Sequence, residues 1–143
     1  RFNLKTGEVK QEQLGDTPSE FPVINNQFTG RQNRYGYAGK IAPLEVPLFE
    51  GINKYDFENN SCEVHLFGEG RFGGEAVFAA RSDDSAEDAG WLVTFVYDEN
   101  EQQSELVIVD AQNITAEPVA RVIIPQRVPY GFHGTWVSQE QLQ

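Results

Sequence analysis

The residue whose side chain is best suited to chemistry lies near the C-terminal end of the chain. His133 follows a Pro-Tyr turn and stands close to Gly131 and Gly134. Because these glycines carry no side chain, a bulky group can approach the imidazole. Neutral imidazole is a common ligand of divalent metals, and its second ring nitrogen usually donates to a carboxylate. The alternative is an exposed turn histidine without a ligand, and the residues around His133 leave both open.

Two glutamates stand at places in the sequence similar to that of His133. Hairpins are predicted over residues 2–14 and 54–67, because short β-prone segments flank turns of glycine or asparagine. A glycine follows each hairpin, and a glutamate soon opens a new apolar segment: Glu20 after the first and Glu75 after the second. This internal repeat, with His133 in its third round, divides the chain into units of roughly residues 1–53, 54–110 and 111–143.

The remaining pattern is also that of strands. Strands are predicted over residues 91–97, 106–109, 119–124 and 135–137, the first two buried on both faces, with one short turn over 112–117. Repeats of this length, built from antiparallel strands, are typical of β-propeller blades. We therefore expect an all-β fold of about two and a half blades packed around an axis.

Such a fold would bring the three candidate residues together. The innermost strand of each blade begins at the axis, so one residue per unit can reach a common centre. Glu20, Glu75 and His133 are expected to converge there. A solvated loop is the usual position of a glutamate, and it remains the alternative for Glu20 and Glu75.

Composition and single residues narrow the function further. The net charge of −11, without a basic stripe, excludes nucleic acid as a partner. No apolar segment reaches the roughly 18 residues that cross a bilayer. Cys62 is the only cysteine and there is no leader at Arg1, so we expect a reducing, cytoplasmic location. Cys62 and His65 are expected to fill strand positions rather than sites, and residues 81–88 a solvated acidic loop.

Five segments, in this order, resemble those of the carotenoid cleavage oxygenases, a family of non-heme iron enzymes. The first is Glu20-Phe-Pro with its neighbours, and the last is Tyr130-Gly-Phe-His133-Gly. Together they extend over nearly the whole chain: residues 19–37, 73–78, 88–97, 104–111 and 127–137.

The resemblance implies a seven-bladed β-propeller of which this chain forms the C-terminal blades. It also implies Fe(II) held by four histidines, with three glutamates behind them. His133 matches one of those histidines, and Glu20 and Glu75 match two of the glutamates. The other ligands have no counterpart here, so we expect this chain alone to hold no iron and to be inactive.

The function implied by the resemblance is oxidative cleavage of a conjugated double bond in a carotenoid or apocarotenoid, giving carbonyl products. Its partners would be an apolar polyene, dioxygen and the N-terminal blades, and peripheral attachment to membranes is left open. Tyr130, Phe132 and Trp136 either line a tunnel for the polyene or are ordinary packing residues. The alternatives are a non-catalytic propeller fragment that serves as an interaction module, or cleavage of lignostilbenes or isomerisation of retinoids on the same fold.

Overall fold

The computed structural model describes residues 1–13, 15–82 and 86–142. Among these residues there are strands and two short 3-10 helices (η), and no α-helix. In chain order the elements are β1 (Ser19–Val23), η1 (Asn26–Phe28), β2 (Tyr35–Ile41), β3 (Phe49–Asp56), β4 (Ser61–Leu66), β5 (Arg71–Gly73), β6 (Val77–Ala80), β7 (Gly90–Asp98), β8 (Gln103–Asp110), β9 (Ala120–Ile124) and η2 (Gln139–Leu142). The prediction of an all-β fold is confirmed.

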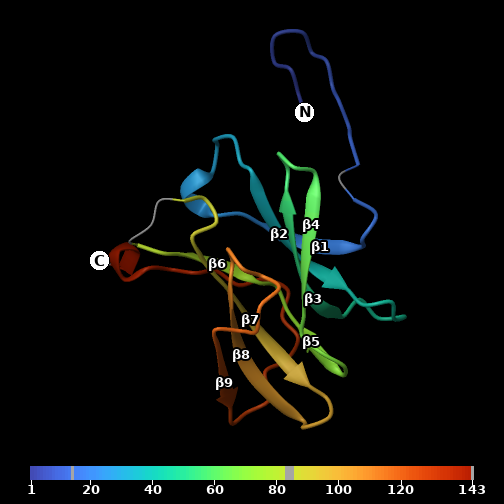
Figure 1. Cartoon of the computed structure of the whole chain (residues 1–143), viewed down its shortest axis with the longest axis vertical. Coiled ribbons are helices and arrows are strands. Elements are labelled where there is room, and N and C mark those ends of the chain that lie inside the picture. Colours follow the sequence, from blue (N-terminus) through green and yellow to red (C-terminus); the bar gives the residue numbers. More distant parts are fainter. Residues whose placement is uncertain (14, 83–85, 143) are drawn as a thin grey trace.

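The strands form two antiparallel meanders, which lie one above the other in Figure 1. The first runs β1-β2-β3-β4, and the second runs through β5 and β6 to β7, β8 and β9. One pairing, between Phe49 on β3 and Gly73 on β5, connects them. Each meander has the form of one propeller blade.

The hydrophobic core lies between the two blades. Tyr37 and Ile52 of the first blade belong to the same buried cluster as Phe78, Leu92 and Val107 of the second. The rings of Tyr37 and Phe78 stack with centroids 5.5 Å apart. Because one face of each blade can be removed from water only by the other, the blades stabilise each other by burial of apolar surface.

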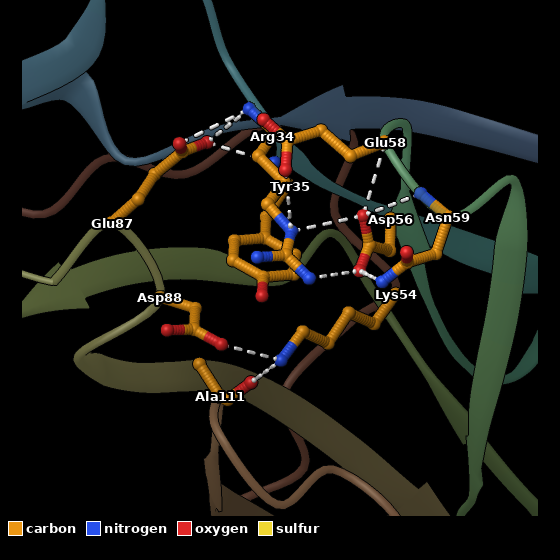
Figure 2. A network of polar contacts seen from close by, with 9 residues as sticks. All are labelled: Arg34, Tyr35, Lys54, Asp56, Glu58, Asn59, Glu87, Asp88 and Ala111. Carbon is orange, nitrogen blue, oxygen red and sulfur yellow. Dashed lines mark hydrogen bonds and ion pairs between the residues drawn. The ribbon is translucent and has the colours of Figure 1, made fainter.

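A buried lysine joins the blades through polar contacts. Lys54 on β3 has a side chain that is 5% exposed, and its ammonium group donates to the Asp88 carboxylate at 2.8 Å. It also donates to the Ala111 carbonyl at 2.7 Å and lies 4.6 Å from the centre of the Tyr35 ring. Figure 2 shows Lys54 reaching from the first blade to these groups. The charge is therefore buried but paired, which is the condition for its stability.

A second group of contacts lies beside the lysine (Figure 2). The Arg34 guanidinium donates to both oxygens of Asp56, at 3.1 and 2.7 Å, and holds the pKa of that carboxyl well below its usual range. The backbone amides of Arg34 and Tyr35 donate to the Glu87 carboxylate at 2.7 to 3.0 Å. These contacts attach the start of β2 to the segment that precedes β7.

A β-bulge interrupts the first strand of each blade. Val23 lies three positions after Glu20 on β1, whereas their partners on β2, Tyr37 and Gly39, are only two positions apart. In the second blade, Val77 lies four positions after Gly73, whereas their partners on β7, Val93 and Val96, are three positions apart. A bulge changes the direction of side chains and is frequent beside functional sites. Glu20 opens the first bulge and Glu75 lies within the second.

Most strand predictions are confirmed, and three need correction. The predicted hairpin over residues 54–67 is β3–β4, and residues 91–97, 106–109 and 119–124 lie in or beside β7, β8 and β9. The prediction that residues 91–97 are buried on both faces is wrong for one face of β7, which is only partly covered, with Phe95 49% exposed. The turn predicted over 112–117 is present.

The strand predicted over residues 135–137 is wrong, because the structure pairs this segment with no other strand among the described residues. The hairpin predicted over residues 2–14 is reduced to one bridge between Phe2 and Val9, and Leu14 lies outside the described residues. The side chains of Phe2 and Val9 are exposed, and a two-stranded hairpin that no other layer covers has little to stabilise it. The boundary between the predicted units 1–53 and 54–110 falls within β3, and the division into units stays a prediction. Residues 83–85 of the predicted acidic loop also lie outside the described residues.

His65 gives the fold a dependence on pH. It is buried on β4, and its Nδ1 lies 3.0 Å from the Ile114 carbonyl oxygen. Burial lowers the pKa of His65, so the unfolded chain binds a proton more readily than the folded chain. This contribution to stability is complete above the unfolded pKa of about 6.5 and is lost as pH falls through the lower folded value.

We therefore expect the free energy of unfolding to decrease between about pH 7.5 and about pH 5. Urea unfolding of the chain at several pH values measures this decrease. The variant His65→Gln can keep a donor to Ile114 but does not titrate, so its dependence on pH should be smaller. Equal dependence in the two proteins would contradict the assignment to His65.

Candidate metal centre

Glu75 is presented by the bulge between β5 and β6. The Gly74 amide still donates to the Phe95 carbonyl at 3.0 Å, and the Thr94 hydroxyl donates to the Gly74 carbonyl at 3.2 Å. These bonds fix the backbone on both sides of the extra residue. The Glu75 side chain is consequently held in a largely covered position, 12% exposed.

The segment that carries His133 returns from β9 to this bulge. The Val128 amide donates to the Ser104 hydroxyl at 2.8 Å, and the Arg127 guanidinium lies 4.7 Å from the centre of the Tyr97 ring. Tyr130 packs edge-on against Tyr97 at 6.3 Å. The segment is therefore anchored on β7 and β8 just before it reaches Glu75.

One oxygen of Glu75 meets both the backbone and the side chain of this segment. Glu75 Oε2 accepts the Gly134 amide at 2.7 Å and lies 3.5 Å from His133 Nδ1. The bond from the Gly134 amide is short, as expected for a strong hydrogen bond to a charged acceptor. The separation between His133 Nδ1 and Glu75 Oε2 is longer than in a well-formed hydrogen bond. The His133 side chain is 73% exposed, and among the described residues its Nε2 has no polar partner. The imidazole thus has one nitrogen at a carboxylate and the other available to a ligand.

A small hollow of about 230 Å³ adjoins the pair. Aromatic residues of β7 and of the His133 segment line it, among them Phe95, Tyr97 and Tyr130. Its surface is therefore mainly apolar next to the imidazole.

Glu20 is not brought to this pair. Its side chain is exposed and borders a different hollow, together with Ser19, Tyr37 and Tyr55. Among the described residues, no hydrogen bond or ion pair joins Glu20 to Glu75 or His133. The next residue, Phe21, does contact the His133 ring, with centroids 5.0 Å apart. The expected convergence of Glu20 stays a prediction.

The chemistry of the His133 and Glu75 pair fits part of a metal site. A metal-binding imidazole normally has a carboxylate or carbonyl at its second nitrogen, and Glu75 fits that role. No group of three or more potential ligands (His, Cys, Asp or Glu) is found among the described residues. The second histidine, His65, is buried on β4 and bonded to Ile114, so it does not add a ligand here. The chain supplies one imidazole and the carboxylate behind it.

The chain matches a known protein family over nearly its whole length. The family model described as retinal pigment epithelial membrane protein matches residues 1–138. The chain belongs to this family. Together with the relatives and solved structures described next, this match confirms the resemblance to the carotenoid cleavage oxygenases.

The relatives of this chain include plant enzymes. It is 42% identical to carotenoid 9,10(9',10')-cleavage dioxygenase 1 of Pisum sativum, over 100% of this chain and 29% of that protein. It is 43% identical to a chloroplastic 9-cis-epoxycarotenoid dioxygenase of Oryza sativa subsp. japonica, over 100% of this chain and 23% of that protein. The chain therefore spans less than a third of the length of these relatives.

Solved structures of the family agree in fold. The cobalt-substituted apocarotenoid oxygenase of Synechocystis has a TM-score of 0.89 and 34% identity, over 96% of this chain and 29% of that one. A chimera of an apocarotenoid oxygenase and RPE65 has a TM-score of 0.88 and 31% identity, with the same coverage. The blades described above are therefore a part of the family's β-propeller. No helix in the described part of this chain is long and apolar enough to cross a membrane.

Replacing the carboxylate of Glu75 with an amide tests whether its negative charge supports the His133 imidazole. Glu75→Gln in the full-length protein can still accept the Gly134 amide but carries no negative charge. We expect metal affinity or activity to fall roughly 10- to 100-fold with the fold retained, and the same for Glu20→Gln. Metal titration measures the affinity, and circular dichroism measures whether the fold is retained. Glu63→Gln, the same change at an exposed position of β4, is the matched control and should have no effect. Full affinity in Glu75→Gln would contradict the role.

Proposed function

We propose that the full-length protein is an Fe(II)-dependent dioxygenase that cleaves a conjugated double bond of a carotenoid or apocarotenoid. The observation that carries this proposal is 42% identity, along the whole chain, to a carotenoid cleavage dioxygenase. The pair of Glu75 and His133 supports it, because the pair has the arrangement expected of a metal ligand and its carboxylate. The substrates would be an apolar polyene and dioxygen, and the N-terminal blades would supply the other ligands.

The residues of this chain would act on the metal from one side. Bound iron supplies an open coordination position where dioxygen can be activated. His133 would bind through Nε2, while its Nδ1–H would donate a hydrogen bond to the Glu75 carboxylate, which would fix the tautomer and make the imidazole more basic. The apolar hollow beside His133 would keep water away and receive part of the polyene. Each alkene carbon gains one oxygen atom of the same dioxygen molecule, so no external electron donor is needed.

Labelled dioxygen tests this reaction directly. The full-length protein, loaded with Fe(II), is incubated with an apocarotenoid under ¹⁸O₂, and the products are examined by mass spectrometry. We expect two carbonyl products, each with one labelled oxygen, and no products after removal of iron with a chelator. A protein with a full complement of iron that cleaves none of a panel of carotenoids, apocarotenoids and stilbenes would favour the interaction module instead.

The isolated chain should not reproduce the metal site. Because it supplies a single imidazole, we expect no stoichiometric binding of Fe(II) at micromolar protein concentration. Anaerobic equilibrium dialysis followed by metal analysis measures this. Tight binding of one equivalent would mean that the ligands lie within this chain after all.

The cytoplasmic location is part of the same proposal. It rests on the single cysteine, which suits a reducing compartment. A relative of rice is named chloroplastic, which makes the plastid the competing location. A fluorescent fusion of the full-length protein that enters plastids would overturn the proposal on this point.

A further inference from the structure

The backbone of Phe21 has an unusual conformation beside the candidate metal centre. Its φ is +56°, in the left-handed region that residues with a side chain rarely adopt. The residue lies in the bulge between Glu20 and Val23, where β1 has one residue more than β2. Strained residues persist where their surroundings hold them, and they are concentrated at functional sites. The conformation determines the direction in which the Phe21 ring points.

On one side, the ring of Phe21 rests on a rigid support. Its centroid lies 5.3 Å from that of Phe49, which is buried on β3. The Phe49 ring in turn lies against Gly39, so closely that a Cβ at Gly39 would be 2.6 Å from Phe49 Cδ1. Only glycine leaves room for this ring, and Gly39 is the residue that pairs with Glu20. Phe21 is thus supported by the framework of the first blade.

On its other side, the Phe21 ring meets the imidazole of His133. The centroids are 5.0 Å apart and the planes are inclined by 69°, an edge-to-face contact. His133 belongs to a segment that otherwise offers the imidazole little packing, since its side chain is 73% exposed. A carboxylate at Nδ1 leaves the ring free to tilt about that contact. A second contact at the ring itself removes this freedom.

We propose that Phe21 is a positioning residue that fixes the plane of the His133 imidazole. Glu75 sets the tautomer, and Phe21 sets the rotation of the ring and so the direction of Nε2. This inference rests on the proposed function, because the direction of Nε2 matters only if His133 binds the metal. It adds a residue from the first blade to a pair formed entirely by the second blade and the C-terminal segment.

The test replaces Phe21 in the full-length protein loaded with Co(II), whose EPR spectrum reports the arrangement of the ligands. Phe21→Leu removes the aromatic ring, and Phe21→Gly removes it while relieving the backbone, because glycine adopts positive φ freely. We expect both variants to keep one equivalent of cobalt but to change the spectrum. In the Fe(II) enzyme, kcat should fall roughly 10-fold with little change in KM.

The conservative variant Phe21→Tyr keeps the ring edge and should restore both the spectrum and kcat. Phe132→Leu is the matched control for the spectrum, since Phe132 adjoins the same ring but is 76% exposed and does not support the imidazole. An unchanged cobalt spectrum and kcat in Phe21→Gly would overturn the positioning role while leaving the proposed function intact. Full metal content and activity in His133→Ala would instead overturn the metal-binding role of His133, on which the inference depends. The proposed function itself would be overturned if the iron-loaded wild-type protein cleaved none of the substrates.

Discussion

Replacing His133 with alanine should abolish cleavage by the full-length protein and remove most of its metal. The imidazole is the proposed metal ligand beside Glu75, and the described residues hold no group of three or more potential ligands that could replace it. Because His133 is exposed and packs mainly against Phe21, its loss should leave the two blades intact. Iron content per protein, turnover of an apocarotenoid and circular dichroism together measure this outcome.

The second histidine provides a matched control for this change. His65→Gln removes a histidine of the same chain that lies on β4, bonded to the Ile114 carbonyl and away from Glu75. It should keep both iron and activity. If the His133 variant kept normal iron and activity, the match between this segment and the family's metal-ligand motif would be misleading.

Replacing Lys54 with methionine should cause a large loss of stability. Methionine fills a similar volume but leaves the Asp88 carboxylate and the Ala111 carbonyl without their donor at the junction of the blades. Removing one partner of a buried ion pair typically costs about 3–5 kcal/mol, most of it the penalty for the charge left behind. Urea unfolding followed by tryptophan fluorescence measures the change in free energy.

An exposed ion pair of the same chain serves as the control. Arg121 lies 3.9 Å from Glu117, with side chains that are 44% and 95% exposed. Such pairs contribute little, so Arg121→Gln should change the unfolding free energy by less than about 0.5 kcal/mol. A Lys54→Met variant as stable as Arg121→Gln would contradict the stabilising role of the buried ion pair. The double variant Lys54→Met, Asp88→Asn would then show whether the two groups interact at all.

Several elements of the fold follow directly from local patterns in the sequence. The hairpin β3–β4 is marked by Asn59 and Asn60 at its turn, and Asn60 does adopt a positive φ of 52°. The strands β7 and β8 are long and apolar, so they could be placed without knowledge of their partners. The repeat predicts that Glu20, Glu75 and His133 converge. Glu75 Oε2 lies 3.5 Å from His133 Nδ1 in the structure, whereas Glu20 borders a different hollow, and the shared site stays a prediction.

Other features depend on contacts between distant residues and leave no local mark. Lys54 reads as a solvent-facing strand residue, because its partners Asp88 and Ala111 come from the other blade. The bulge at Phe21 is invisible for the same reason: it is defined by the count of residues on β2. Residues 135–137 have strand-forming side chains, yet a strand also requires a neighbour, which the sequence of this segment does not supply.

The bond from Gly134 to Glu75 also has a consequence for the order of folding. It closes a loop of 59 residues, whereas the turns within each blade connect strands that adjoin in the sequence. Contacts between residues far apart in the chain form slowly, because the entropy of loop closure must be overcome first. His133 should therefore reach its position only after the strands of the second blade have formed. Iron would then enter a protein that is already folded, and variants that delay folding would emerge poor in metal although their site residues are unchanged.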